Sequence, residues 1–391
     1  RKMRSLLILA FQCAIGWGLR ACPRPAFRVR ALHSKNGAFS RTFRISGAVP
    51  AGESTPADIG DVTDLMNEEP VTKERVGLPE ALWQFTRPHT LIGSAVAIPA
   101  LYIFSAPPEA TLSIAALVPS MLFALLPALL VNVFIVGLNQ LTDVEIDKVN
   151  KPNLPLASGA LAERTGWIVA LVCLVVGIGS SFAFPALSSA PLRQTLIASA
   201  LIGTAYSLEP FRLKRFPLFA ALCILTVRGA VINVGFMAHS LVSCFGVPLA
   251  NAWTLPLTNI KCALATAFFA AFGIVIALLK DVPDILGDSA HNIRSFTVRL
   301  GTIRVFQLAQ GALSTLLSVT GLGLIWNGLQ GPVSAVALSR GAVGLVCLAA
   351  LVETSKRAAL VETRDKDDVY GFYMWVWKLF YAAYILLPLA R

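Results

Sequence analysis

The sequence predicts an all-α polytopic membrane protein, a bundle of about nine transmembrane helices with two acidic motifs on one face. Of its 391 residues, 55% are apolar and 14% are charged, and the mean hydropathy is +0.68. Soluble domains average roughly 25% charged residues, so a soluble globular protein is excluded. Apolar segments of spanning length recur along the chain, and a group of acidic residues follows two of them.

Residues 1–75 are predicted to be a targeting leader, and residues 76–391 the membrane domain. Residues 1–50 hold ten of the 33 Lys and Arg and no Asp or Glu. An apolar stretch from Leu6 to Leu19 is too short for a comfortable span, and the segment after it is rich in Arg, Ser and Ala. This order is typical of a secretory signal followed by an organelle transit segment. A tenth membrane helix with a linker is the alternative.

Residues 1–50 carry nearly all of the excess positive charge. Residues 51–391 have 23 basic and 22 acidic residues, which leaves no basic face for nucleic acid. Residues 21–27 (ACPRPAF) resemble the junction of bipartite plastid leaders in algae. That resemblance implies a plastid membrane.

Nine apolar segments are the predicted spans, although eight or ten remain possible. They lie at about 90–106, 117–138, 166–184, 195–208, 217–238, 260–279, 304–326, 333–352 and 371–389. The loops after the even-numbered segments are all basic, whereas those after the first, third and fifth carry almost no charge. By the positive-inside rule, the basic loops share the cytoplasm-equivalent face, which in a plastid is the stroma.

Two groups of acids leave the membrane on this face. The second segment ends in NQLTDVEID (139–147), and helical spacing predicts one stripe of Asn139, Asp143 and Asp147. The sixth ends in KDVPDILGD (280–288), whose three aspartates, Asp281, Asp284 and Asp288, also share a helical face. The spacing of four in each motif, 141 residues apart, suggests an internal duplication.

The negative charge of acidic stripes at membrane-helix ends must be balanced by positive charge, and a divalent metal ion is the simplest source. Mg²⁺ prefers oxygen ligands and takes one or two carboxylates together with substrate phosphate oxygens. Two facing stripes could therefore hold two ions around one diphosphate. The alternative is that the acids are solvated caps paired with Lys148, Lys151 and Arg294.

Basic residues near the same face are candidates to neutralise the remaining phosphate oxygens. Each could instead be only a topology signal. They are Arg87, Lys148, Lys151, Arg212, Lys214 and Arg294. The sequence has no GxxxxGK[ST], HExxH or GxSxG motif and only four His, so nucleotide, zinc-protease and serine-hydrolase chemistry are not indicated.

These motifs resemble the UbiA superfamily of intramembrane prenyltransferases. The first motif with its continuation to Gly159, and the second with 293–301, are similar to those of plant and algal homogentisate prenyltransferases. Three further blocks carry the resemblance: 85–90 (FTRPHT), 206–215 (YSLEPFRLKR) and 372–382 (FYMWVWKLFYA). The stretches 143–147 (DVEID), 156–159 (LASG) and 294–296 (RSF) resemble the phytyl-transferring enzymes of tocopherol synthesis more than the solanesyl-transferring ones.

The resemblance implies a Mg²⁺-dependent transfer of a prenyl group from its diphosphate to homogentisate, with loss of CO₂. Asp143, Asp147, Asp284 and Asp288 would hold the metal, with Asn139 and Asp281 in support. Tyr206, Arg212 and Lys214 would bind the diphosphate. Candidates to bind the aromatic acceptor are Arg87, His89, Arg228 and Asn233. The alternatives are that His89 only packs or caps a helix and that Arg228 only pairs with an acid.

Three rival functions stay open. A different prenyl donor or aromatic acceptor would keep the same chemistry. A divalent-cation carrier would use carboxylates spread through the depth of the bilayer, and an inactive relative would bind lipid diphosphates without turnover. The sequence does not fix the oligomeric state.

Overall fold

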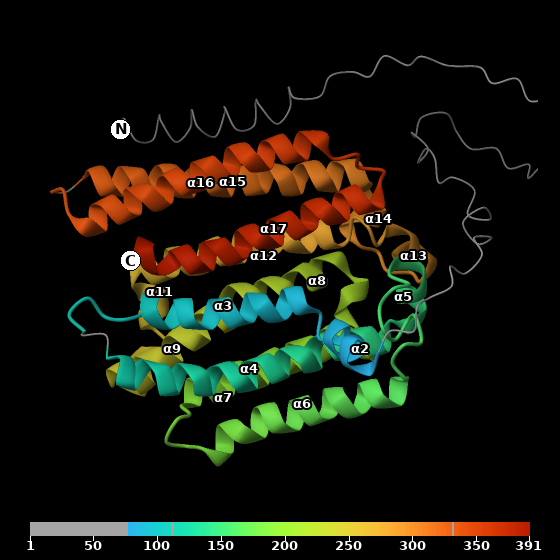
Figure 1. Cartoon of the computed structure of the whole chain (residues 1–391), viewed down its shortest axis with the longest axis horizontal. Helices are drawn as coiled ribbons and strands as arrows, with labels where there is room; N and C mark the ends of the chain where they lie inside the picture. Colours follow the sequence, from blue (N-terminus) through green and yellow to red (C-terminus); the bar gives the residue numbers. More distant parts are fainter. Residues whose placement is uncertain (1–76, 111–112, 331) are drawn as a thin grey trace, which may run out of the picture. The chain divides into compact units, whose positions relative to one another are not determined.

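The computed structural model describes residues 77–110, 113–330 and 332–391, and every regular element among them is a helix (Figure 1). The predicted leader and its cleavage region lie outside the described residues. The elements are α2 Leu78–Phe85, α3 Pro88–Phe104, α4 Ile114–Thr142, α5 Val144–Asn150, α6 Glu163–Ala183, α7 Ala190–Ser207, η1 Leu213–Arg215, α8 Pro217–Ile224, η2 Leu225–Val231, α9 Ile232–Phe245, α10 Leu249–Ala252, α11 Leu255–Thr258, α12 Ile260–Lys280, α13 Ile285–Ala290, α14 Phe296–Leu300, α15 Thr302–Leu329, α16 Ala335–Leu360, α17 Lys366–Leu386 and η3 Leu387–Ala390.

Each of the nine predicted apolar segments coincides with a helix or a run of helices. In the described part of the chain, seven helical stretches are long and apolar enough to cross a membrane. They comprise α4, α6, α12, α15, α16, α17 with η3, and the continuous run α8–η2–α9. The other two predicted segments are the shorter α3 and α7, of 17 and 18 residues.

The outer surface of the bundle is strongly apolar. Leu126, Val175 and Leu338 are each at least 60% exposed, as expected for side chains that face lipid rather than water. Where helices cross, small residues allow the backbones to approach. A Cβ placed on Gly344 of α16 would lie 2.6 Å from the carbonyl oxygen of Gly321 in α15, and such close contacts replace the hydrophobic driving force inside a membrane.

The loops after the second, fourth, sixth and eighth spans meet at one end of the bundle, where α5 and α13 lie together (Figure 1). Lys151, after the second span, pairs with Asp284, after the sixth. Arg212, after the fourth, pairs with Asp143. Lys366, after the eighth, donates to the carbonyl oxygen of Asn150. These bonds confirm that the basic loops share one face.

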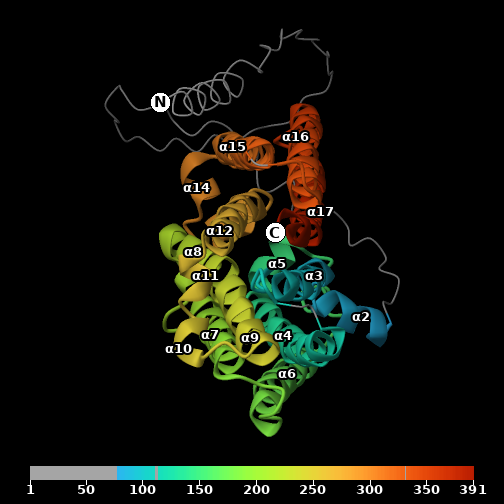
Figure 2. The ribbon, with the colours of Figure 1, turned by 90° about the vertical axis from the view of Figure 1, so that its left-hand side faces the viewer.

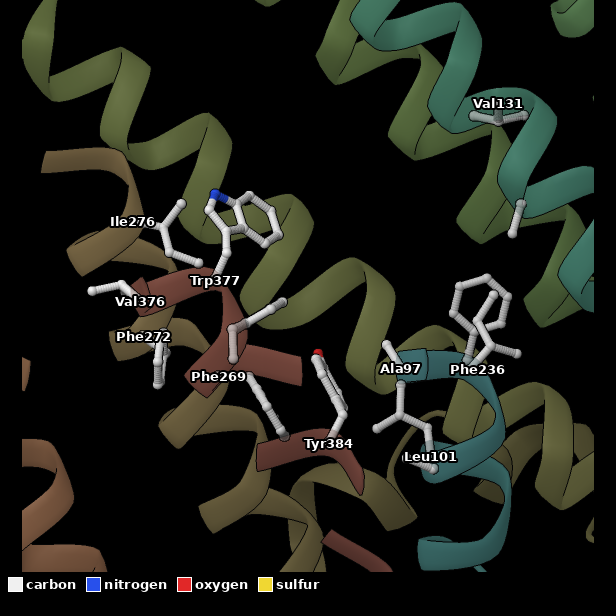
Figure 3. Close-up of a cluster of buried hydrophobic side chains, with 14 of the residues drawn as sticks. Ala97, Leu101, Val131, Phe236, Phe269, Phe272, Ile276, Val376, Trp377 and Tyr384 are labelled. Carbon is white, nitrogen blue, oxygen red and sulfur yellow. The ribbon is translucent and has the colours of Figure 1, made fainter. Parts of the chain in front are cut away.

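The core packs aromatic side chains between α12 and α17 (Figure 3), and α3 in turn packs against both α17 and α9 (Figure 2). The ring of Phe269 stacks on that of Tyr384 with centroids 3.6 Å apart. Figure 3 places Trp377 and Ile276 beside each other, and Phe236 beside Ala97 and Leu101. Between these groups the helices leave room for a cavity, described below.

Candidate functional site

The first acidic motif lies at a break between two helices. α4 ends at Thr142 because the N–H of Asp143 donates to the carbonyl oxygen of Gln140, three residues back. α5 then begins at Val144, with Asp143 as its N-cap residue. The prediction that the motif continues one helix as a single stripe is therefore wrong. The Asn139 side chain nevertheless donates to the Asp143 carboxylate over 3.1 Å.

The second motif is also broken, and here proline supplies the reason. α12 ends at Lys280, and Pro283, which has no N–H to donate, follows in the turn before α13. Asp284 is the N-cap residue of α13. Asp288 lies in the first turn of that helix, and its N–H donates to the carbonyl oxygen of Asp284.

Both motifs line one pocket of about 40 Å³, as the sequence predicted for facing acids. All six predicted polar residues contribute to its wall: Asn139, Asp143, Asp147, Asp281, Asp284 and Asp288. Four cationic side chains line the same pocket: Arg87, Lys151, Lys214 and Lys280. The two motifs are thus neighbours in space and not merely on the same face.

Each acid except Asp288 has a cationic partner among the described residues. Lys214 lies 2.5 Å from both carboxylate oxygens of Asp143, and Arg212 lies 3.1 Å from one of them. Lys151 spans the two motifs, with its ammonium 2.5 Å from both oxygens of Asp284.

The remaining two pairs are looser. Arg87 lies 3.8 Å from Asp147, and Lys280 lies 3.1 Å from Asp281. Lys280 also donates to the Tyr206 hydroxyl over 3.4 Å, which ties the end of α12 to the end of α7.

A hydrogen-bonded clasp joins the two short helices. The Asn150 side-chain oxygen, at the end of α5, accepts from the N–H of Gly287 in α13 over 2.8 Å. Gly287 permits this approach, because a Cβ at that position would lie 2.6 Å from the Asn150 amide group. Sequence reasoning missed this clasp and also Lys280. The position of Lys280, next to Asp281, was the available signal.

Burial and neighbouring charges shift the pKa of three acids in the pocket. Burial raises the pKa of Asp147 to about 6, although Arg87 and Lys151 oppose the shift. Burial, together with the charges of Asp281 and Asp284, raises the pKa of Asp288 to about 7. At Asp284 burial also acts to raise the pKa, but Lys151 and Lys280 outweigh it and lower the value. A bound cation would stabilise the ionised form of Asp147 and Asp288.

The donor set fits Mg²⁺ only if other ligands complete the coordination. No three His, Cys, Asp or Glu side chains of the described residues come together as a metal cage. Mg²⁺ commonly keeps several waters and binds one or two carboxylates together with substrate phosphates. The pocket offers such carboxylates beside lysine and arginine side chains that suit phosphate oxygens.

A larger cavity of about 220 Å³ adjoins the acid pocket and extends between the membrane helices. The residues that line both the cavity and the acid pocket are Arg87, Asn139, Tyr206 and Lys280. Its walls are mainly apolar, with side chains from α3, α4, α7, α8, η2, α9, α12 and α17. A molecule with a charged head and an apolar tail could therefore occupy both spaces at once.

The structure separates the predicted binding residues into two groups. The predicted residues that line the acid pocket, the larger cavity or both are Lys151, Lys214, Tyr206, Arg87, His89 and Arg228. Three of the predicted phosphate-binding residues lie outside both linings. Lys148 is exposed and pairs with Glu145 at 2.6 Å, Arg294 is exposed, and Arg212 pairs with Asp143.

Asn233 also stays out of the cavity. It is fully buried, and its amide donates to the carbonyl oxygens of Arg228 and Gly229. His89 does line the cavity, and its ring lies edge-on to Trp377 with centroids 5.2 Å apart.

Comparison with known proteins reveals clear relatives. Residues 95–379 match the UbiA prenyltransferase family. The chain is 42% identical to the probable homogentisate phytyltransferase 1, chloroplastic, of Oryza sativa subsp. japonica, over 80% of this chain and 73% of that protein. It is 38% identical to the homogentisate geranylgeranyltransferase of Hordeum vulgare, over 80% of this chain and 72% of that protein.

A solved structure has the same fold. The apo structure of a UbiA homolog from Aeropyrum pernix K1 aligns with a TM-score of 0.53 at 16% identity. The alignment covers 77% of this chain and 95% of that chain.

Proposed function

This chain belongs to the UbiA prenyltransferase family, and we propose that it transfers a prenyl group, preferably phytyl, from a prenyl diphosphate to homogentisate. The names of the rice and barley relatives support the acceptor. The observation that carries the proposal is the acid pocket opening into an apolar cavity. This arrangement suits a donor with an anionic head and a long hydrocarbon tail.

The acid pocket is the proposed site of the diphosphate and its metal. Asp143, Asp147, Asp284 and Asp288 would hold Mg²⁺, with Asn139 and Asp281 in support. Bound Mg²⁺ neutralises the charge that develops on a diphosphate leaving group.

Cationic and hydroxyl side chains would bind the phosphate oxygens that the metal leaves free. They are Lys151, Lys214, Arg212 and Tyr206. Lys148 and Arg294 have no part in this proposal, because both are exposed and neither lines the pocket.

The reaction joins the first carbon of the prenyl chain to a carbon of the aromatic ring. The carbon–oxygen bond to diphosphate breaks, and its electron pair leaves with the diphosphate. The ring supplies the electron pair of the new carbon–carbon bond. The ring carbon that forms the new bond loses its proton to solvent, and this loss restores aromaticity. The acetate carboxylate departs as CO₂, its electron pair stays on the methylene carbon, and a proton from solvent converts that carbon to a methyl group. Apolar walls such as Ile135, Val136 and Ile276 would keep water from the allylic cation.

The test is product identification by mass. Membranes that contain the protein are given homogentisate, Mg²⁺ and, in turn, phytyl, geranylgeranyl and solanesyl diphosphate. We expect a decarboxylated, prenylated product, with phytyl diphosphate giving the highest kcat/KM. Geranylgeranyl transfer is the second candidate because of the barley relative. Absence of product with all three donors would overturn the proposal.

Variants of the two motifs test the roles of the acids. Asp143→Asn and Asp284→Asn each remove a charge from the pocket and are expected to lower kcat by at least 100-fold, in the range seen when a main electrostatic contact is lost. Glu145→Gln is the matched control. It lies between Asp143 and Asp147 but is exposed, and it should retain wild-type activity.

We also propose that the protein resides in a plastid membrane with the acid pocket on the stromal side. The name of the rice relative supports the plastid, and the basic loops support the orientation. A membrane-impermeant maleimide should label a Lys148→Cys variant from the stromal side of isolated plastid membranes, beyond the labelling of the unaltered protein. Labelling only from the opposite side would contradict the orientation.

A further inference from the structure

Arg228 is a cation placed inside the membrane span Pro217–Phe245. Its side chain lines the apolar cavity. Among the described residues, its guanidinium has no hydrogen-bond or ion-pair partner. Its contacts are aromatic, with the guanidinium carbon 4.7 Å from the ring centre of Trp377 and 5.8 Å from that of Phe380. An ionisable side chain at this depth is costly, so such residues usually serve an ion or ligand.

The backbone around Arg228 is specially shaped to present it. The segment Leu225–Val231 is a π-helical turn, a feature frequent at functional sites. The Asn233 amide fixes this turn by donating to the carbonyl oxygens of Arg228 over 2.6 Å and Gly229 over 2.9 Å. The Tyr384 hydroxyl in turn donates to the Asn233 side-chain oxygen over 2.9 Å. Two buried polar residues thus hold the turn that carries Arg228.

The surroundings of Arg228 suit a flat ligand with one negative charge. Trp377 and His89 give this part of the cavity an aromatic wall, and Val227 and Ile276 add apolar surface. The planar guanidinium can donate two parallel hydrogen bonds to a carboxylate. The site would therefore take an aromatic carboxylate, with the ring against the wall and the carboxylate on Arg228.

The diphosphate is a poor candidate for this position. The Cβ of Arg228 faces Gly273, seven residues before Lys280 on α12 and about 10 Å from it along the helix axis. The acid pocket near Lys280 already contains Lys151, Lys214 and Arg87. A ring anchored at Arg228 would lie between this residue and the acid pocket, on the side where the first prenyl carbon is expected.

We propose that Arg228 binds the carboxylate of the aromatic acceptor and selects anionic acceptors, with Asn233 and Tyr384 as its positioning residues. This inference rests on the proposed function and adds the chemical basis of acceptor choice. It also changes the role of Asn233, which the sequence suggested as a direct contact to the acceptor.

The experiment compares homogentisate with its methyl ester, which has the same ring but no negative charge and would be prenylated on the ring, with loss of the ring proton, while keeping its ester group. The kcat/KM ratio for the two acceptors is measured in the wild type and in Arg228→Gln, with the same prenyl donor and Mg²⁺. A charge-assisted hydrogen bond is worth about 1.5–3 kcal/mol, so we expect the preference for homogentisate to fall by about 10- to 100-fold. The KM for the donor should change by less than twofold.

The ratio does not depend on how much of the variant folds, because both acceptors are tested on the same preparation. Arg228→Lys keeps the charge without the planar fork and should retain part of the preference. Arg193→Gln is the matched control. Arg193 also stacks on an aromatic ring, that of Phe182 at 5.4 Å, but lies outside the cavity lining, and its removal should leave the ratio unchanged.

The outcomes separate this inference from the proposed function. If the wild type prenylates neither acceptor, the proposed function fails. If the wild type prenylates homogentisate and Arg228→Gln keeps the wild-type ratio, the assignment of Arg228 is wrong although the function stands. If Arg228→Gln loses both acceptors equally and its donor KM rises, Arg228 serves the fold or the donor, which also overturns the assignment.

Discussion

Replacing Asn150 by Ala should separate the two acidic motifs without removing any acid. Asn150 is 2% exposed, and its side-chain oxygen is the acceptor for the Gly287 N–H at 2.8 Å. The substitution removes this bond and leaves the N–H of Gly287 without a partner in a buried place. Such a loss costs about 1–3 kcal/mol.

The cost should appear where the two motifs act together. The metal and the diphosphate need both motifs in place. Without the clasp, part of their binding free energy must be used to hold the two motifs together, so binding becomes weaker. A free energy of 1–3 kcal/mol corresponds to about a 5- to 150-fold change in an equilibrium. We therefore expect the Mg²⁺ concentration for half-maximal rate to rise by a factor in this range at fixed donor.

The assay is initial rate against Mg²⁺ concentration in the Asn150→Ala variant, the wild type and an Asn153→Ala control. Asn153 lies in the loop that follows α5 and is exposed, so its removal should leave the Mg²⁺ dependence unchanged. An Asn150→Ala enzyme with the Mg²⁺ dependence of the wild type would refute the reasoning, because the clasp would then contribute nothing to the site.

Three further predictions concern the metal, the donor and the packing. Chelation with EDTA should abolish turnover and added Mg²⁺ should restore it; turnover that persists in EDTA would contradict a metal-dependent site. Lys214→Met removes an ammonium 2.5 Å from Asp143 and should raise the donor KM by about 10- to 100-fold with the homogentisate KM unchanged, whereas an unchanged donor KM would exclude a diphosphate contact. Gly235→Ala puts a Cβ 2.9 Å from that of Thr195 and against its hydroxyl; this overpacking should destabilise the protein in detergent by about 1–3 kcal/mol and lower its unfolding temperature, while Gly341→Ala, with no atom within 4 Å of the added Cβ, should not.

The sequence predicted the fold and the meeting of the motifs because both depend on strong, local signals. Spanning length and apolarity locate the helices, and the charge of the loops assigns their side of the membrane. These rules brought the first and second motifs to one face, and the pocket they share is confirmed.

The details that the sequence did not predict depend on contacts between distant segments. The clasp between Asn150 and Gly287 joins residues 137 positions apart. The role of Asn233 depends on a π-helical turn and on Tyr384 from another helix. Helical periodicity also cannot show that the N–H of Asp143 bonds to Gln140 instead of Asn139, and this bond breaks the predicted stripe.

The two motifs share a local structure as well as a spacing, and this explains how six polar residues reach one small pocket. In each motif a membrane helix ends, an aspartate occupies the N-cap position of a helix of six or seven residues, and a second aspartate follows four positions later. The N–H of the second aspartate bonds to the carbonyl oxygen of the first in both, at 2.7 Å for Asp147 and 3.0 Å for Asp288. Because α5 and α13 lie against each other, their aspartates face a common space. Uninterrupted acidic stripes on two long helices would instead meet only along the line of contact between those helices.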